Sequence, residues 1–137
     1  MVSNPAAATS FRCSMAPWLS VRNSARAVDF YKSAFAATEV YRLDGPEGGV
    51  VARLSVEGAE FWVSDESPEH GNFSPQTVGG TSVRMILTVA DPDKVFARAL
   101  QAGASAVWPV SEGHGWRVGR VADPFGHHWE IGRPLAA

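Results

Sequence analysis

The sequence predicts an α+β protein in which one small βαβββ unit occurs twice. An apolar strand followed by a helix occurs near the start of the chain and again near its middle. Val21 and Val89, at the ends of these two strands, are related by an offset of 68, and Arg53 and Arg120, in a later strand of each copy, by an offset of 67. Since neither copy is large enough to bury its own apolar face, the two are expected to pack on each other in a single domain.

The first copy covers about residues 15–66. Asn23 and Ser24 are good N-cap residues for a helix that follows the first strand. The apolar stripe expected to be buried on this helix consists of Val28, Tyr31, Ala34 and Phe35. Strands are expected at 18–21, 38–43, 50–56 and 59–64, with a glycine-rich loop at 44–49 and a tight hairpin turn at 57–58.

The second copy covers about residues 82–133, after an irregular crossover linker at 67–81 that is rich in proline and glycine. Asp91 caps the second helix, Pro92 takes its first position, and Gly103 ends it. The stripe expected to be buried consists of Val95, Phe96, Ala99 and Leu100. Strands are expected at 83–89, 105–110, 117–122 and 128–131, a loop at 111–115, and a type I turn at 123–126.

Composition excludes several classes of function. The 137 residues suit one domain, which is expected to cover 15–135 after a disordered tail at 1–14; a native start at Met1 or at Met15 stays open.

A net charge of −2 without a basic block argues against nucleic acid as a partner, and no apolar run is long enough to span a membrane. The single cysteine, Cys13, allows no intramolecular disulfide, and the N-terminal segment has no pattern of a secretion signal, so we expect a cytoplasmic protein.

Three segments resemble the vicinal-oxygen-chelate superfamily of glyoxalase I, fosfomycin and bleomycin resistance proteins, and extradiol dioxygenases. They are Ala-Val-Asp-Phe-Tyr-Lys-Ser-Ala-Phe at 27–35, Ala-Leu-Gln-Ala-Gly-Ala at 99–104, and Trp-Arg-Val-Gly-Arg-Val-Ala-Asp-Pro-Phe-Gly-His-His-Trp-Glu-Ile at 116–131. The resemblance covers about residues 17–133, and the closing motif looks most like the PhnB-like branch. It implies a glyoxalase/bleomycin resistance fold, in which each module forms half of an open barrel-like cleft, and a homodimer.

The resemblance also implies a divalent metal, Zn, Ni, Mn or Fe, held by the first and last strands of each module. The family's last-strand carboxylate falls on Glu130, but the equivalent position in the first copy is Trp62, and indole does not ligate a metal. The first-strand positions fall on Ala16 or Pro17 and on Val83 or Arg84, none of which is a suitable ligand. We therefore expect no cofactor, and Glu130 is a metal ligand only if a metal is present. A shifted register with Glu60 in place of Trp62 would recover one more ligand at most.

Glu130 and His128 are the candidate catalytic residues. They lie two apart on one strand and so share a face, opposite to His127 and Trp129, and together they could act as general base and acid. The alternative is a structural ion pair between Glu130 and Arg84. His127 is expected to make a local hydrogen bond, and Arg53 and Arg120 to be equivalent scaffold residues. The candidate ligand-binding residues are Trp18, Trp62, Arg84, His114 and Trp116.

Three functions remain open from the sequence, and whether the protein is an enzyme stays undecided. The first is a metal-free binding protein of the bleomycin-resistance kind, which holds a small, possibly aromatic molecule between the modules. The second is a metal-dependent lyase or isomerase of the glyoxalase kind that uses Glu130. The third is a non-catalytic scaffold. The identity of the ligand does not follow from the motifs, because pocket shape sets it.

Overall fold

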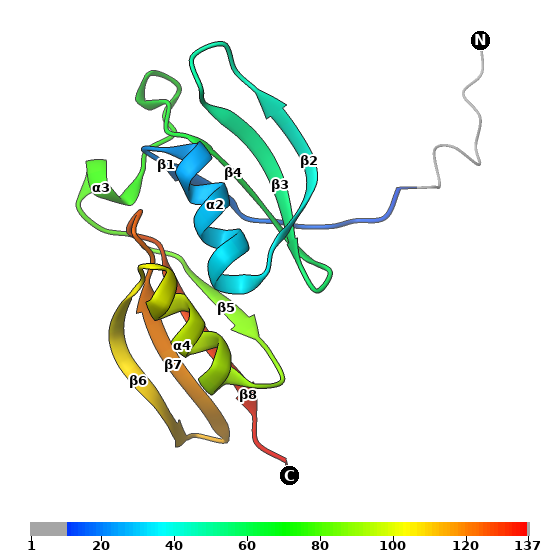
Figure 1. Ribbon diagram of the computed structural model, residues 1–137, viewed down its shortest axis with the longest axis vertical. Helices are drawn as coiled ribbons and strands as arrows, with labels where there is room; N and C mark the ends of the chain where they lie inside the picture. The colour runs from blue at the N-terminus through cyan, green and yellow to red at the C-terminus, as the bar shows by residue number, and fades with distance from the viewer. Residues whose placement is uncertain (1–10, 137) are drawn as a thin grey trace.

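The computed structural model describes residues 11–136 and contains two modules with the same order of elements, which confirms the predicted α+β class and the repeat (Figure 1). The first module consists of β1 (Trp18–Val21), α2 (Ser24–Phe35), β2 (Thr38–Asp44), β3 (Val50–Val56) and β4 (Ala59–Asp65). The second consists of β5 (Arg84–Thr88), α4 (Pro92–Ala102), β6 (Ser105–Gly113), β7 (Trp116–Ala122) and β8 (His128–Pro134). Of the predicted tail, residues 1–10 lie outside the described residues, and 11–14 are exposed and form no helix or strand.

Each module forms one four-stranded sheet, and the strand order is the same in both. The orders are β1-β4-β3-β2 and β5-β8-β7-β6, with β1 parallel to β4, β5 parallel to β8, and all other neighbours antiparallel. The register aligns Trp18 with Trp62 in the first sheet and Ile86 with Glu130 in the second. The repeat seen in the sequence is therefore a repeat of strand pairing, residue by residue.

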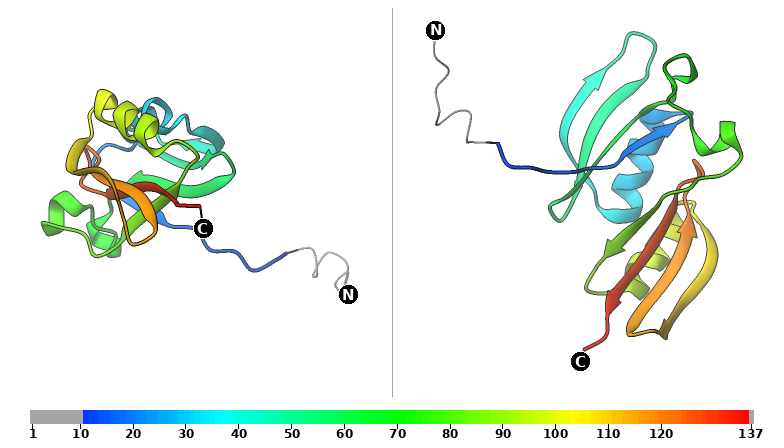
Figure 2. Two further views of the ribbon diagram at one scale, coloured as in Figure 1. Left: turned by 90° about the horizontal axis from the view of Figure 1, so that it is seen from below. Right: turned by 180° about the vertical axis from the view of Figure 1, so that it is seen from behind.

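The two helices lie on the same side of the two sheets and pack against each other (Figures 1 and 2). Strand β3 shows the alternation that this layering demands, because every second residue from Val50 to Val56 is buried under α2. Tyr31 of α2 is fully buried among aromatic rings of both modules, including Phe61 and Trp129. One apolar core thus joins the modules on the helical side and leaves the opposite face of each sheet open.

Asp123 ties the modules together inside this core. Its Oδ2 accepts hydrogen bonds from the Tyr31 hydroxyl at 2.5 Å and from Trp129 Nε1 at 3.0 Å. Its Oδ1 accepts from the backbone N–H groups of Phe125 and His127, each at 2.9 Å. Burial first, and then the Asp123 carboxylate, raise the pKa of Tyr31 well above its ordinary value, so its hydroxyl stays a donor. The predicted turn at 123–126 forms here, with a hydrogen bond from Gly126 N to Asp123 O at 3.1 Å.

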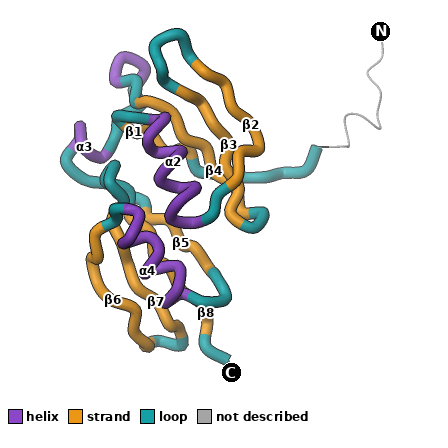
Figure 3. The backbone as a smooth tube through the Cα atoms, viewed as in Figure 1, coloured by secondary structure: helices purple, strands orange, loops and turns teal. Residues whose placement is uncertain are grey.

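The linker differs from the irregular segment that the sequence predicted (Figure 3). It contains two short helices, η1 (Pro68–His70) and α3 (Pro75–Val78). A proline begins each, where its missing N–H costs no hydrogen bond, and Ser74 caps α3 by accepting from Thr77 N at 3.3 Å. No helix within residues 11–136 is long and apolar enough to cross a membrane.

Two other expectations for the second module were wrong. The loop at 111–115 is mostly strand, because β6 stays paired with β7 until Gly113 faces Trp116, and only His114 and Gly115 turn. Leu100 is exposed, since α4 buries the face that carries Phe96 and Ala99. His127 makes the expected local hydrogen bond through its backbone N–H to Asp123 Oδ1 at 2.9 Å, while its ring Nε2 lies 3.0 Å from the Ser20 carbonyl oxygen in the other module.

Candidate functional site

The open face of each sheet carries a row of four side chains, one from each strand. We call these the first row and the second row. Strand pairing aligns the members of each row directly with one another, and corresponding members are related by the same sequence offset of 67 or 68. The first row is Trp18, Trp62, Arg53 and Tyr41, and the second row is Ile86, Glu130, Arg120 and Trp108.

Glu130 lies at the centre of the second row between two arginines. Its Oε2 accepts a hydrogen bond from Arg120 Nη2 at 2.8 Å and another, very short, from Arg84 Nε. Burial alone raises the pKa of Glu130, but the hydrogen bonds and charges of Arg120 and Arg84 outweigh it, and the net pKa is below the ordinary value. Glu130 is therefore ionised at neutral pH, and the Arg84–Glu130 ion pair that the sequence left as an alternative is present. The Arg120 guanidinium also lies over Trp108, 4.5 Å from the ring centre.

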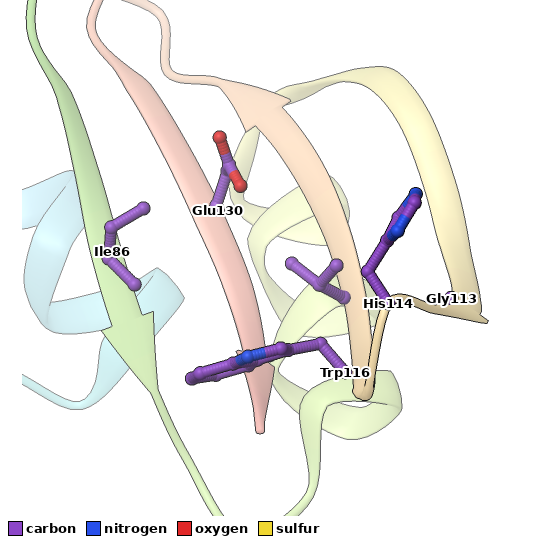
Figure 4. A pocket seen from close by; sticks show the side chains of 7 residues that line it. Ile86, Gly113, His114, Trp116 and Glu130 are labelled. Carbon is purple, nitrogen blue, oxygen red and sulfur yellow. The ribbon is translucent and has the colours of Figure 1, made fainter. Parts of the chain in front are cut away.

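A hollow of about 310 Å³ opens beside Glu130, and we call it the Trp116 hollow. In Figure 4 the indole of Trp116 extends from the start of β7 across β8 towards β5, and Ile86 and Glu130 project into the space beside it. His114 reaches the same hollow from the β6–β7 turn, where its φ of 52° puts it in the left-handed region. Three of the predicted site residues, Glu130, Trp116 and His114, thus come together.

A second hollow, of about 300 Å³, lies next to the first on the same sheet face, and we call it the arginine hollow. It is lined by Arg84, Arg120 and His128 together with residues 80–83 at the end of the linker. His128 is therefore placed in a different hollow from Glu130, the residue with which the sequence paired it. Arg120 was missed as a site residue. The repeat offset makes it the equivalent of Arg53, and the first hairpin pairs Arg53 with Trp62, the equivalent of Glu130. These two signals together could have placed Arg120 beside Glu130.

Trp18 and Trp62 belong to the first row and line neither of these hollows. Their rings stack on each other, with centres 5.0 Å apart and planes 10° apart. Arg53 lies over Trp62, 5.4 Å from the ring centre, and its Nε is 3.4 Å from Glu60 Oε1. Trp18 and Trp62, two of the predicted ligand-binding residues, therefore form an aromatic surface on the first module that is separate, within one chain, from the two hollows.

The residues present do not fit the divalent metal of the family's enzymes. Glu130, the one matching carboxylate, is already held by two cationic side chains, which repel a metal ion. The pairing of Trp18 with Trp62 fixes the register of the first sheet, so Trp62 and not Glu60 takes the position equivalent to Glu130. Within residues 11–136, no three His, Cys, Asp or Glu side chains are close enough together to share a metal ion.

Tandem βαβββ modules with helices on one side and open sheet faces on the other define the fold class of the vicinal-oxygen-chelate superfamily. Residues 18–132 match the glyoxalase-like domain, and the chain belongs to this family. An uncharacterized protein of Mycobacterium bovis is 42% identical over 126 residues, covering 88% of this chain and 83% of the relative.

Solved structures agree with this assignment. The X-ray structure of a gene product from Arabidopsis thaliana is 32% identical, with a TM-score of 0.66, and covers 88% of this chain and 96% of that one. A fosfomycin resistance protein from Listeria monocytogenes, solved with Mn(II) and sulfate, is similar in fold alone: it is 15% identical, has a TM-score of 0.69, and covers 91% of this chain and 94% of that one.

Proposed function

We propose that this glyoxalase-like protein binds a small, flat aromatic molecule in the Trp116 hollow and does so without a metal. The observation that carries the proposal is the Arg84–Glu130–Arg120 ion triad beside a hollow that the indole of Trp116 lines. The triad uses the carboxylate that a metal would need, while the Trp116 ring offers a flat apolar surface of the kind on which an aromatic ring stacks.

The same triad favours binding over proton transfer. A general acid or base works best when its pKa lies near the working pH. The arginines hold the pKa of Glu130 below its ordinary value, so the carboxylate stays deprotonated and is a weak base. His128, the proposed partner in acid–base catalysis, faces the arginine hollow instead.

We also propose that the protein is a homodimer. Half-exposed aromatic side chains, among them Trp18, Tyr41 and Trp108, stand on the open sheet faces, and outer strands present unpaired backbone groups. A second copy would cover these faces, and it could bring the aromatic first row of one chain to the second row of the other. Light scattering should give twice the chain mass of 14.7 kDa; a monomer would contradict this part of the proposal.

Native mass spectrometry with added Zn, Ni, Mn or Fe, followed by calorimetry with flat aromatic compounds, tests the proposal. We expect no stoichiometric metal and binding that weakens about tenfold or more in Trp116→Ala. Phe73→Ala is the control, because it removes an exposed ring from the linker, outside both rows. Binding unaffected by Trp116→Ala would contradict the proposal.

The lyase or isomerase alternative keeps one supporting observation, since Glu130 lies at the last-strand position of the family's metal ligand. It requires a stoichiometric metal that is lost in Glu130→Gln, and a turnover that the same variant abolishes. Either result would replace the binding protein with an enzyme, whereas wild-type turnover in Glu130→Gln would exclude this alternative.

A further inference from the structure

The two sheet faces share one framework but differ in charge. In the first module a single arginine, Arg53, pairs with a single carboxylate, Glu60. In the second module the residue equivalent to Glu60 by the repeat offset is His128. There two arginines, Arg84 and Arg120, share Glu130. The second face therefore carries one more positive charge than its carboxylate neutralises.

Arg84 is not part of the shared framework. The repeat offset places Ala16 or Pro17 at the equivalent position, so the first module forms the same sheet without a counterpart. The Arg84 guanidinium has spare hydrogen-bonding capacity, because Nε donates to Glu130 while the side chain remains 55% exposed and lines the arginine hollow. Its terminal N–H groups are available to a ligand.

Arg120 adds a second guanidinium to the lining of this hollow. Its side chain is 20% exposed, and its Nη2 donates to Glu130. Its buried Nε has no hydrogen-bond partner within residues 11–136, and the same is true of the equivalent Arg53 Nε, so this donor belongs to the shared framework. The residues that line the arginine hollow include hydroxyls, at Thr81 and Ser82, but no carboxylate. Such a lining favours a negatively charged group rich in oxygen acceptors.

The two hollows are close enough for one ligand to reach both. Each of three strands contributes one residue to the arginine hollow and, two positions away on the same face, one to the Trp116 hollow. These pairs are Arg84 and Ile86 on β5, His128 and Glu130 on β8, and Arg120 and Val118 on β7. Two positions along a strand correspond to about 7 Å, a span that a fused two-ring system covers roughly from the middle of its far ring to the outer oxygens of an acidic group on its other ring.

We propose that the arginine hollow binds the oxyanionic group, a carboxylate or a phosphoryl group, of a ligand whose aromatic part lies on Trp116. The inference rests on the proposed function and names its ligand class. Glu130 orients such a ligand, because its carboxylate lines the Trp116 hollow and repels an anion there, while Arg84 and Arg120 attract the anion to the other side.

Calorimetric titration of the full-length protein with 2-naphthoate, 2-naphthyl phosphate and the neutral 2-naphthamide, at fixed ionic strength and neutral pH, tests this. At least one acid should bind about tenfold or more tightly than the amide. Arg84→Gln should remove that advantage, and Arg84→Lys should keep part of it. Arg22→Gln is a matched control, because Arg22 is also 55% exposed and pairs with a glutamate that is 18% exposed, against 19% for Glu130.

The outcomes separate this inference from the proposed function. A preference for the carboxylate or for the phosphate, lost in Arg84→Gln alone, supports the inference and identifies the anion. If the amide binds as tightly as both acids, the aromatic-binding function stands and the anion site is refuted. If Arg22→Gln weakens the acids as much as Arg84→Gln, the effect is one of overall charge, and the site is again refuted. If none of the three compounds binds, both proposals fail. Thermal melts of each variant verify that it is folded.

Discussion

Tyr31→Phe removes one hydroxyl from the centre of the molecule and leaves the ring in place. The lost hydrogen bond joins a fully buried phenol to the Asp123 carboxylate at 2.5 Å and connects the two modules. Hydrogen bonds to charged groups contribute about 1.5–3 kcal/mol, and phenylalanine leaves no large cavity. The carboxylate keeps its bonds from Trp129, Phe125 and His127. We therefore expect a loss of about 2 kcal/mol in the free energy of unfolding, or roughly 6–10 °C in Tm for a domain of this size.

Urea unfolding followed by far-ultraviolet circular dichroism, at one fixed protein concentration, measures this loss. Tyr41→Phe is the control, because it makes the same chemical change on an exposed side chain and should alter stability by less than about 0.5 kcal/mol. If Tyr31→Phe is as stable as Tyr41→Phe, the phenol–carboxylate bond does not hold the modules together, and our account of the inter-module core is refuted.

Three further changes test other parts of the structure. Glu130→Gln should be less stable than the wild type above pH 4.5, because the pKa of Glu130 is depressed in the folded state. The difference in free energy of unfolding should vanish as the pH falls through that lowered pKa. Urea melts across the acid range measure this difference, and a difference that does not change with pH would contradict the prediction. Gly132→Ala should cost about 1–3 kcal/mol, since its Cβ would lie 2.7 Å from the Arg117 carbonyl oxygen, while Gly113→Ala, with open space around it, should leave the melting temperature nearly unchanged. Asn23→Ala should cost about 1 kcal/mol by thermal melting, because its side chain caps α2 by accepting from Arg26 N at 3.2 Å; no change would mean that the cap is dispensable.

Local patterns were enough to predict the fold and the direction of several key side chains. The repeat offset alone made Trp62 the counterpart of Glu130, and the strand register confirms that the two occupy equivalent positions. Strand alternation predicted that Trp129 and Glu130 face opposite ways, and Trp129 is indeed buried in the core. The first feature follows from the internal repeat and the second from the alternation of side chains along one strand, and the sequence carries both directly.

The sequence left the Arg84–Glu130 ion pair as an alternative, but other contacts between distant segments were beyond such reasoning. The bond between Tyr31 and Asp123 joins residues 92 apart; the only sequence signal was a tyrosine in an apolar stripe, which needs a polar partner somewhere. The two hollows depend on how Arg84, from β5, and Arg120, from β7, converge on Glu130 between them. The homodimer, the PhnB-like branch and the cytoplasmic location remain predictions.

The position of Asp123 has a consequence for how the chain folds as it is made. Tyr31 emerges from the ribosome early, and its partner follows 92 residues later, which is about 5–20 s of synthesis. During that interval a completed first module would have to bury its phenol without an acceptor. The amino-terminal half is therefore expected to stay incompletely packed until the last strands appear, and a nascent chain stalled before Asp123 should be digested by protease far faster than the finished protein.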